Sequence, residues 1–165
     1  MKKVIILLTL FVLVFSCVTP LTSAVTLENF NDFQYAVVSG EITITDYTGN
    51  ATEVKIPSTI DGYPVKNIAL LAFSNCYKLT SITIPDSVTI IGNSAFYNCC
   101  NLTSVTIPNS VTIIGDSAFY NCCDLTSITI PDSITSIGDE VFYGCNNLTE
   151  VTIGKGVTTI SSYAF

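Results

Sequence analysis

The side chains in this sequence that could do chemistry are cysteines and carboxylates, because none of the 165 residues is a histidine. Without histidine, neither a Ser-His-Asp triad nor a Cys-His pair can be assembled. Zinc sites with histidine ligands are excluded for the same reason. Seven cysteines and thirteen aspartates or glutamates remain as candidates for catalysis or metal binding.

Several aspartates recur at a spacing of 23 residues, which would bring them together if segments stacked at the strand spacing of about 4.8 Å. Three sets of equivalent positions exist: Asp86, Asn109 and Asp132; Asn93, Asp116 and Asp139; and Asn101, Asp124 and Asn147. Two sets alternate a charge with an amide, which avoids repulsion between like charges, and only Asp116 and Asp139 would be adjacent. We therefore expect neither a calcium cage nor a glycosidase pair, and we predict no catalysis, metal or cofactor.

Four cysteines share the 23-residue spacing, namely Cys76, Cys99, Cys122 and Cys145. This recurrence favours buried free thiols that behave as small hydrophobic groups, since stacked equivalents have parallel Cβ vectors that suit a disulfide poorly. Cys100 and Cys123 lie one residue further on and are candidates for facing outward. In an exported protein these two form our candidate disulfide. A zinc site of four cysteines lacks the paired spacing that such sites use.

Two rows of side chains are candidates for binding other molecules. The first is an outward face of predicted strands, formed by Ser81, Thr83, Ser104, Thr106, Ser127, Thr129, Glu150 and Thr152. The second is an aromatic row of Tyr97, Tyr120 and Tyr143, which would stack on sugars or anchor a protein. Two alternatives stay open, because threonine suits any exposed strand and the tyrosines could pack against neighbouring coils.

All these positions are set by a repeat. The segment LTSITIPDSVTIIGNSAFYNCCN starts at residue 79, and LTSVTIPNSVTIIGDSAFYNCCD follows directly at residue 102. A period of this length indicates a solenoid, propeller or array. One unit cannot bury its own apolar residues, whereas stacked units can. The phenylalanines in phase with the repeat are predicted to form one interior column: Phe96, Phe119, Phe142 and Phe165.

Each unit divides into local elements. Alternating apolar residues at its start predict a short strand, and Pro85 ends that strand because it has no N–H to donate. Gly92 is predicted to permit a tight turn. Residues 93–99 suit one helical turn, with Asn93 or Ser94 as its cap.

The chain is predicted to contain a leader over 1–24, an N-terminal cap over 25–50 and a solenoid over 51–165. The repeats are a divergent unit at 51–78, full units at 79–101, 102–124 and 125–147, and a partial unit at 148–165. Five extra residues around 59–64 predict a surface bulge. Two strands around Ser39 and Gly40, over 33–38 and 41–45, predict a hairpin that caps the first coil. The last coil shows no polar cap, so truncation, cover by a partner and contact with a second copy stay open.

Residues 1–24 have the order of a secretory signal, with Lys2 and Lys3 before an apolar run that is too short to span a membrane. Release after Ala24 is favoured. A lipid anchor at Cys17 stays open, because residues 14–17 are similar to a bacterial lipobox apart from Phe15. Removing the leader leaves four of the six lysines against 13 acids, a net charge of −9. Nucleic acid and acidic lipid surfaces are therefore disfavoured as partners.

The pattern LxxIxIPxSVxxIGxxAFxxCxx, as it stands over 79–101, closely resembles the BspA-like leucine-rich repeats, also called the Treponema pallidum type. The segment GEITITDYTGNATEVKIPSTIDGYPVKNI looks like the lead-in of that family. The resemblance covers residues 33–165. It implies a curved leucine-rich-repeat solenoid, mainly β, with short parallel strands along one face and helical or 3-10 turns. It also implies secreted or surface proteins used in adhesion, host-protein binding and aggregation between cells.

The resulting hypothesis is a secreted or cell-surface protein that binds an extracellular protein or cell-surface ligand without catalysis. The alternative is a structural or self-assembling module whose C-terminal coil meets another copy. The identity of the ligand does not follow from fold or repeat.

Overall fold

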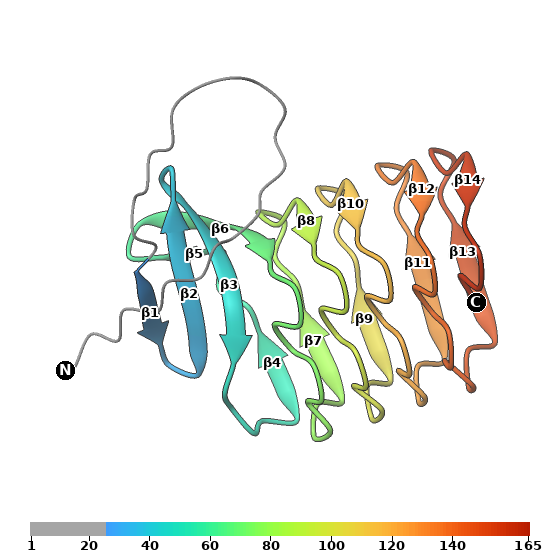
Figure 1. Cartoon of the computed structure of the whole chain (residues 1–165), viewed down its shortest axis with the longest axis horizontal. Coiled ribbons are helices and arrows are strands. Elements are labelled where there is room, and N and C mark those ends of the chain that lie inside the picture. The colour runs from blue at the N-terminus through green and yellow to red at the C-terminus, as the bar shows by residue number, and fades with distance from the viewer. Residues whose placement is uncertain (1–25) are drawn as a thin grey trace.

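The computed structural model describes residues 26–165, which form fourteen β-strands and no helix. The strands lie in successive coils that stack side by side from the N-terminal to the C-terminal end (Figure 1). The predicted solenoid of short parallel strands is confirmed. The leader over 1–24, with Cys17, lies outside the described residues. In the described range no helix is long and apolar enough to cross a membrane.

Each coil contributes one strand to each of two rows. The first row is β4 (Glu53–Lys55), β7 (Ser81–Thr83), β9 (Ser104–Thr106), β11 (Ser127–Ile130) and β13 (Glu150–Ile153). The second row is β6 (Tyr63–Ile68), β8 (Ile90–Ile91), β10 (Ile113–Ile114), β12 (Ser136–Ile137) and β14 (Thr159–Ile160). Paired repeat strands are parallel, with partners 23 residues apart, as Ser81 with Ser104 and Ile90 with Ile113. Strand pairing in the first row is interrupted between β9 and β11.

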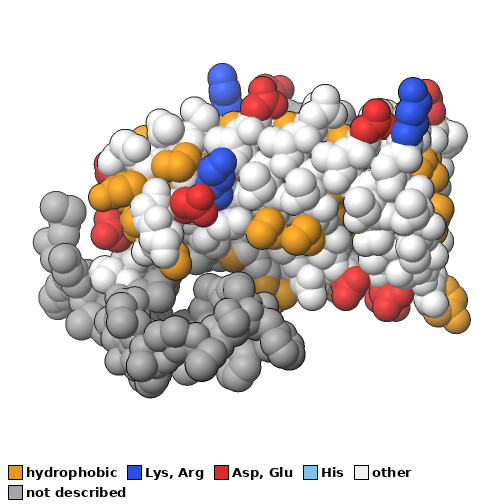
Figure 2. Space-filling model, turned by 90° about the horizontal axis from the view of Figure 1, so that it is seen from above, with side chains coloured by type: hydrophobic (Ala, Val, Ile, Leu, Met, Phe, Trp, Pro, Cys, Tyr) orange, Lys and Arg blue, Asp and Glu red, His pale blue; other side chains and the backbone are white. Residues whose placement is uncertain are grey.

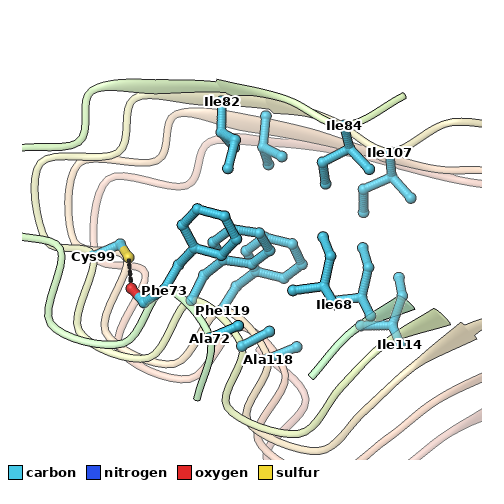
Figure 3. Close-up of a cluster of buried hydrophobic side chains, with 14 of the residues drawn as sticks. Ile68, Ala72, Phe73, Ile82, Ile84, Cys99, Ile107, Ile114, Ala118 and Phe119 are labelled. Atoms are coloured by element: carbon cyan, nitrogen blue, oxygen red, sulfur yellow. Dashed lines mark hydrogen bonds between the residues drawn. The ribbon is translucent and has the colours of Figure 1, made fainter. Parts of the chain in front are cut away.

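The interior of the coils holds a column of phenylalanine rings. Neighbouring rings stack with centroids between 5.1 and 5.5 Å apart along Phe73, Phe96, Phe119, Phe142 and Phe165. Figure 3 shows Phe73 and Phe119 of this column between isoleucines from the two opposite sides of the coil. The predicted column is confirmed. Burial of each of the first four rings contributes roughly 2 kcal/mol, whereas Phe165 is 49% exposed. An isolated coil would not bury its ring in this way.

The segment 93–99 is not a helical turn, so that expectation is wrong. Ser94 and Asn98 have φ of 52° and 58°, which lies outside the right-handed helical region. Its N–H groups alternate between two kinds of acceptor. Those of Phe96 and Asn98 donate to carbonyls of the next coil at 2.8 Å, and the N–H of Tyr97 donates back to Ser94 at 3.1 Å. A helix would use these N–H groups internally and would leave neighbouring coils without their bonds.

Three antiparallel strands close the N-terminal end: β1 (Leu27–Phe30), β2 (Phe33–Val38) and β3 (Glu41–Tyr47). The predicted hairpin is present as β2 and β3, and β3 continues into the second row by running parallel to β6. The ring of Tyr47 stacks on Phe73 at 5.3 Å, and Phe33 meets Phe73 edge-on at 6.4 Å. The cap therefore ends the phenylalanine column with aromatic rings of its own.

The five extra residues of the first coil form a second hairpin, in which β5 (Thr59–Ile60) pairs with β6. Its turn residues, Asp61 and Gly62, have φ of 51° and 84°. Positive φ at both central residues is the geometry of a type I′ turn. Ile60 is buried, so the predicted surface bulge also contributes to the core.

Gly92 has a different role from the one expected. Its φ is not positive, unlike that of Gly40, Gly62 and Gly144. A Cβ at position 92 would lie 2.8 Å from the carbonyl carbon of Ala69 and from the amide nitrogen of Leu70. Glycine is therefore required here because the backbones of two coils approach closely, and not because the turn itself is strained.

Candidate functional site

The first strand row presents an outward polar surface, called here the strand face. Ile82, Val105 and Ile128 point inward and are buried, while the residues on either side of each point outward. The parallel register pairs β7 with β9 and β11 with β13, and the repeat continues both rows from β9 to β11. The predicted residues thus form two rows, which are Ser81, Ser104, Ser127 and Glu150, and Thr83, Thr106, Thr129 and Thr152. Of these, only Ser81 is half-buried. The structure thus brings all eight predicted residues onto one face.

Sequence reasoning missed the first members of both rows. Glu53 pairs with Ser81 and Lys55 pairs with Thr83, and both are exposed on β4. Aligning the divergent unit on its inward Val54 and Ile56 would have located them, because side chains alternate along a strand. The row of serines therefore carries a carboxylate at each end, Glu53 and Glu150, with uncharged hydroxyls between them.

The hydroxyls of the strand face differ from those beside it. Thr80, Thr103 and Thr149 precede the strands and donate their hydroxyls to carbonyls of the previous coil, at 2.9, 3.0 and 3.3 Å. Their role is to tie coils together. In residues 26–165 no strand-face side chain takes part in such a bond. The strand-face hydroxyls are therefore free to pair with another molecule.

Charge is sparse around the solenoid. Figure 2 shows one side of the molecule, where the lysines lie beside acidic side chains and these small charged groups are separated by a mostly uncharged surface. Only 12% of the whole sequence is charged. The solenoid surface therefore offers mainly uncharged hydrogen-bonding groups.

The predicted tyrosine row exists, but its geometry changes its interpretation. Tyr97, Tyr120 and Tyr143 stack at 5.0 and 5.1 Å, and Tyr163 meets Tyr143 edge-on at 6.4 Å. Partial desolvation raises the pKa of the Tyr120 phenol, and the phenols of Tyr143 and Tyr97 raise it further. Because the inner ring faces contact one another, sugars cannot stack along the row. Only the first face of Tyr97 has no tyrosine against it.

The recurring cysteines lie at the interior position that the period predicts. Cys99, Cys122 and Cys145 are buried and donate their thiols to the carbonyls of Phe73, Phe96 and Phe119, at 3.0, 3.4 and 3.2 Å. All six described cysteines are free. These thiols fill the core and tie coils together, in agreement with the interpretation as buried free cysteine.

Cys100 and Cys123 are half-buried neighbours in successive coils. The N–H of Asp124 donates to the carbonyl of Cys100 at 3.0 Å and holds the two segments together. Burial raises the pKa of the Cys123 thiol, and its contact with the Cys100 thiol raises it further. The two thiols therefore lie close to one another, and the disulfide itself stays a prediction.

The recurring aspartates bind backbone of the following coil. The carboxylates of Asp116 and Asp132 accept the N–H groups of Asp139 and Lys155 at 2.9 and 2.7 Å. Asp139 accepts the N–H of Ser162 at 3.1 Å in the same way. In the part of the chain that the structure describes, no three Cys, Asp or Glu side chains gather as a metal site would need. These carboxylates have a structural role.

Comparison with known proteins identifies the family to which the repeat is similar. The family model described as the BspA type leucine rich repeat region matches residues 66–165 in six copies. No curated protein matches the chain.

Several solved structures are similar. A leucine-rich cell surface protein from Faecalibacterium prausnitzii A2-165 is 35% identical, with a TM-score of 0.67, over 84% of this chain and 45% of that one. A leucine-rich repeat protein from Bacteroides capillosus ATCC 29799 is 29% identical, with a TM-score of 0.68, over 77% of this chain and 97% of that one. One from Eubacterium ventriosum ATCC 27560 is 25% identical, with a TM-score of 0.69, over 84% and 42%. The chain thus spans less than half of the first and third proteins.

Proposed function

The chain belongs to the BspA-type leucine-rich-repeat family, and from that premise we propose that it binds proteins outside the cell through the strand face, without catalysis. One observation carries the proposal. The outward hydroxyls of β7, β9 and β11 form two regular rows that the fold does not use, although the threonines beside them are used.

The strand face fits a protein partner better than a small molecule. Its two rows extend over successive coils, and specific protein interfaces are likewise extended and bury about 800 Å² on each side. Parallel strands hold the hydroxyls rigidly, so little side-chain entropy is lost when a partner binds. The acids at both ends of the serine row, Glu53 and Glu150, lie at the polar rim of such an interface.

A location at the cell surface or outside the cell agrees with the predicted leader and with the surface protein among the similar structures. Two observations support a function without catalysis. Histidine is absent, and Asp116, Asp132 and Asp139 are engaged with backbone N–H groups.

The experiment measures binding of the full chain to immobilised matrix proteins, to host cells and to the producing organism's surface. The double variant Thr106→Glu/Thr129→Glu places two carboxylates in the middle of the strand face and is expected to abolish binding. The matched control, Ser136→Glu/Thr159→Glu, adds the same charge to exposed positions of the second row and is expected to bind like the wild type. No binding to any surface, or equal loss in both variants, would count against the proposal.

A second candidate function, self-association, is favoured by the exposed side of the last coil. Val151 and Ile153 are 36% and 43% exposed, whereas their equivalents Ile128 and Ile130 are 2% and 1% exposed under the following coil. A second copy would cover this apolar surface. Light scattering over a concentration series is expected to show growth in mass that Ile153→Lys removes, and a mass independent of concentration would exclude the candidate.

A further inference from the structure

One interface between coils differs from the others in its hydrogen bonds. This interface, called here the seam, lies between the coil of residues 102–124 and the coil of residues 125–147. In the first strand row, the N–H groups of Thr103 and Thr149 donate to the preceding coil at 3.0 and 2.9 Å. The N–H of Thr126, which would make the same bond across the seam, lies 3.5 Å from its acceptor. The strands on either side of the seam, β9 and β11, are not paired.

The second strand row is interrupted at the same place. The N–H groups of Thr112, Gly115 and Thr158 donate to the preceding coil at 2.9 Å. In the part of the chain that the structure describes, neither Thr135 nor Gly138 makes the equivalent bond across the seam. The strands β10 and β12 accordingly belong to separate sheets.

The recurring glycine of the second row measures the spacing of the coils independently. A Cβ at Gly115 would lie 2.5 Å from the backbone nitrogen of Asn93 in the preceding coil. At Gly138 the nearest backbone atom would be the Cα of Asp116, at 3.7 Å. The backbones of the two coils are therefore further apart at the seam.

The opposite side of the same two coils stays joined. Ser117, Phe119 and Asn121 donate their N–H groups to carbonyls of the next coil at 2.9, 2.9 and 2.8 Å. The rings of Tyr120 and Tyr143 stack across the seam at 5.1 Å, close to the 5.0 Å of the preceding tyrosine pair. The seam is thus a wedge, closed along the turns and wider at both strand rows, which is the geometry of a hinge.

Two enlarged core residues account for the wedge. Ile134 stands where the preceding coil has Val111. Val141 stands where that coil has Ala118. All four side chains are buried, and added methyl groups in a packed core push its neighbours apart. The core itself stays closed, because Ile114 beside the seam is only 6% exposed.

The interface that follows shows how such spreading is avoided elsewhere. The last coil has Gly154 and Gly156 where the coil before it has Pro131 and Ser133. A Cβ at these glycines would lie 2.5 and 2.1 Å from backbone atoms of the preceding coil. The missing side chains let the last coil approach closely, and its strand rows are paired.

We propose that the solenoid bends at the seam, with the turn side as the hinge, and that this bending fits the strand face to its partner. The second part rests on the function proposed above. The seam crosses the strand face between Thr106 and Thr129, so bending changes the spacing of the hydroxyl rows there. Within each half, paired strands keep the hydroxyls rigid. The Ser133 hydroxyl still donates to the carbonyl of Val111, which limits how far the wedge opens.

Residual dipolar couplings of the backbone amides test the bending in the full chain without a partner. In the wild type, residues 26–124 and 125–165 are expected to require two different alignment tensors, because the halves move relative to one another. Val141→Ala restores the alanine of the other coils and is expected to close the seam, so that one tensor fits both halves. A single tensor for the wild type would overturn the proposal.

The matched control is Val88→Ala, which removes the same atoms from a buried position in the coil of residues 79–101. It is expected to keep two tensors. A melting curve shows whether each variant is folded, and Ile134→Val replaces Val141→Ala if the latter is not. Two tensors in both Val141→Ala and Ile134→Val, or one tensor in Val88→Ala, would show that these residues do not hold the seam open.

The strand-face binding assay separates this inference from the proposed function. Val141→Ala keeps every strand-face residue and is expected to bind the wild type's partner about threefold or more weakly, because the bent conformations are no longer populated. An unchanged affinity would overturn the role of bending in binding. If the wild type binds no partner, the proposed function fails, while two tensors in the wild type would still support the hinge.

Discussion

At the residue scale, glycines are as important for the stacking of the coils as the large side chains of the core. Gly92, Gly115 and Gly138 occupy one position of the repeat, yet their surroundings differ. A Cβ at Gly92 would meet backbone atoms at 2.8 Å, whereas at Gly138 it would meet only the Asp116 carboxylate closer than 3.4 Å. Backbone cannot move without separating the coils, but a carboxylate can rotate.

Because their surroundings differ, Gly92 and Gly138 are expected to lose different amounts of folding stability when each is replaced by alanine. Gly92→Ala is expected to lower the free energy of unfolding by about 2 kcal/mol or more, because coils must separate to admit the methyl group. Gly138→Ala is expected to cost about 1 kcal/mol or less, because only the Asp116 carboxylate moves. Urea denaturation measures both values. Equal losses would show that the close approach at Gly92 is not what requires glycine.

At the element scale, one phenol connects two strands of the N-terminal cap with the turn between β5 and β6. The buried Tyr35 on β2 donates its hydroxyl toward Asp61, at 2.6 Å in the β5–β6 turn, and lies 3.1 Å from the carboxylate of Glu28 on β1. Burial raises the pKa of Tyr35 above its ordinary value, and the hydrogen bonds to Asp61 and Glu28 raise it further. The cap and the first coil are thus joined by a group that must stay protonated.

This arrangement predicts a loss of stability in alkali. Since the folded-state pKa is raised, the stabilisation is complete below the unfolded-state pKa of about 10 and decreases as the pH rises above it. Tyr35→Phe is expected to lower stability by about 1 kcal/mol at neutral pH and to show a smaller further decrease above pH 10. Denaturant titrations at several pH values test this, with the exposed Tyr77→Phe as control. A parallel decrease for Tyr35→Phe and the wild type would contradict the assignment.

On the scale of the whole molecule, each coil contacts only its neighbours, so stability is close to a sum of coil and interface contributions. The aromatic column runs without a break from Tyr47 in the cap to Phe165. The middle coils are covered on both sides. The last coil is covered on one side, and Ile153 and Ile160 are 43% and 50% exposed.

Hydrogen exchange is therefore expected to follow position along the solenoid. In dilute protein, amides of β13 and β14 should exchange roughly tenfold or more faster than those of β9 and β11, because opening the last coil breaks one interface and opening a middle coil breaks two. Mass spectrometry of proteolytic fragments measures the gradient. Uniform protection at low concentration would contradict nearest-neighbour stability, and protection that appears only at high concentration would support self-association.

The 23-residue period by itself determined the solenoid, the phenylalanine column and the eight residues of the strand face. Equivalent strand residues of a repeat point to the same side of their coils, so alternation within one strand identifies the outward residues of all the strands. The two members on β4, Glu53 and Lys55, escaped prediction because their unit diverges from the repeat. The leader, the lipid at Cys17 and the Cys100–Cys123 disulfide stay predictions.

Only the tertiary structure decided how coils meet. The prediction of a helical turn over 93–99 was wrong because alternate N–H groups of this segment donate to carbonyls of the next coil. The local sequence does not indicate hydrogen bonds between coils. For the same reason, the close approach of two coils at Gly92 became visible only in the structure. Which atoms of one coil reach the next depends on how the coils stack, and residue spacing within one coil does not contain that information.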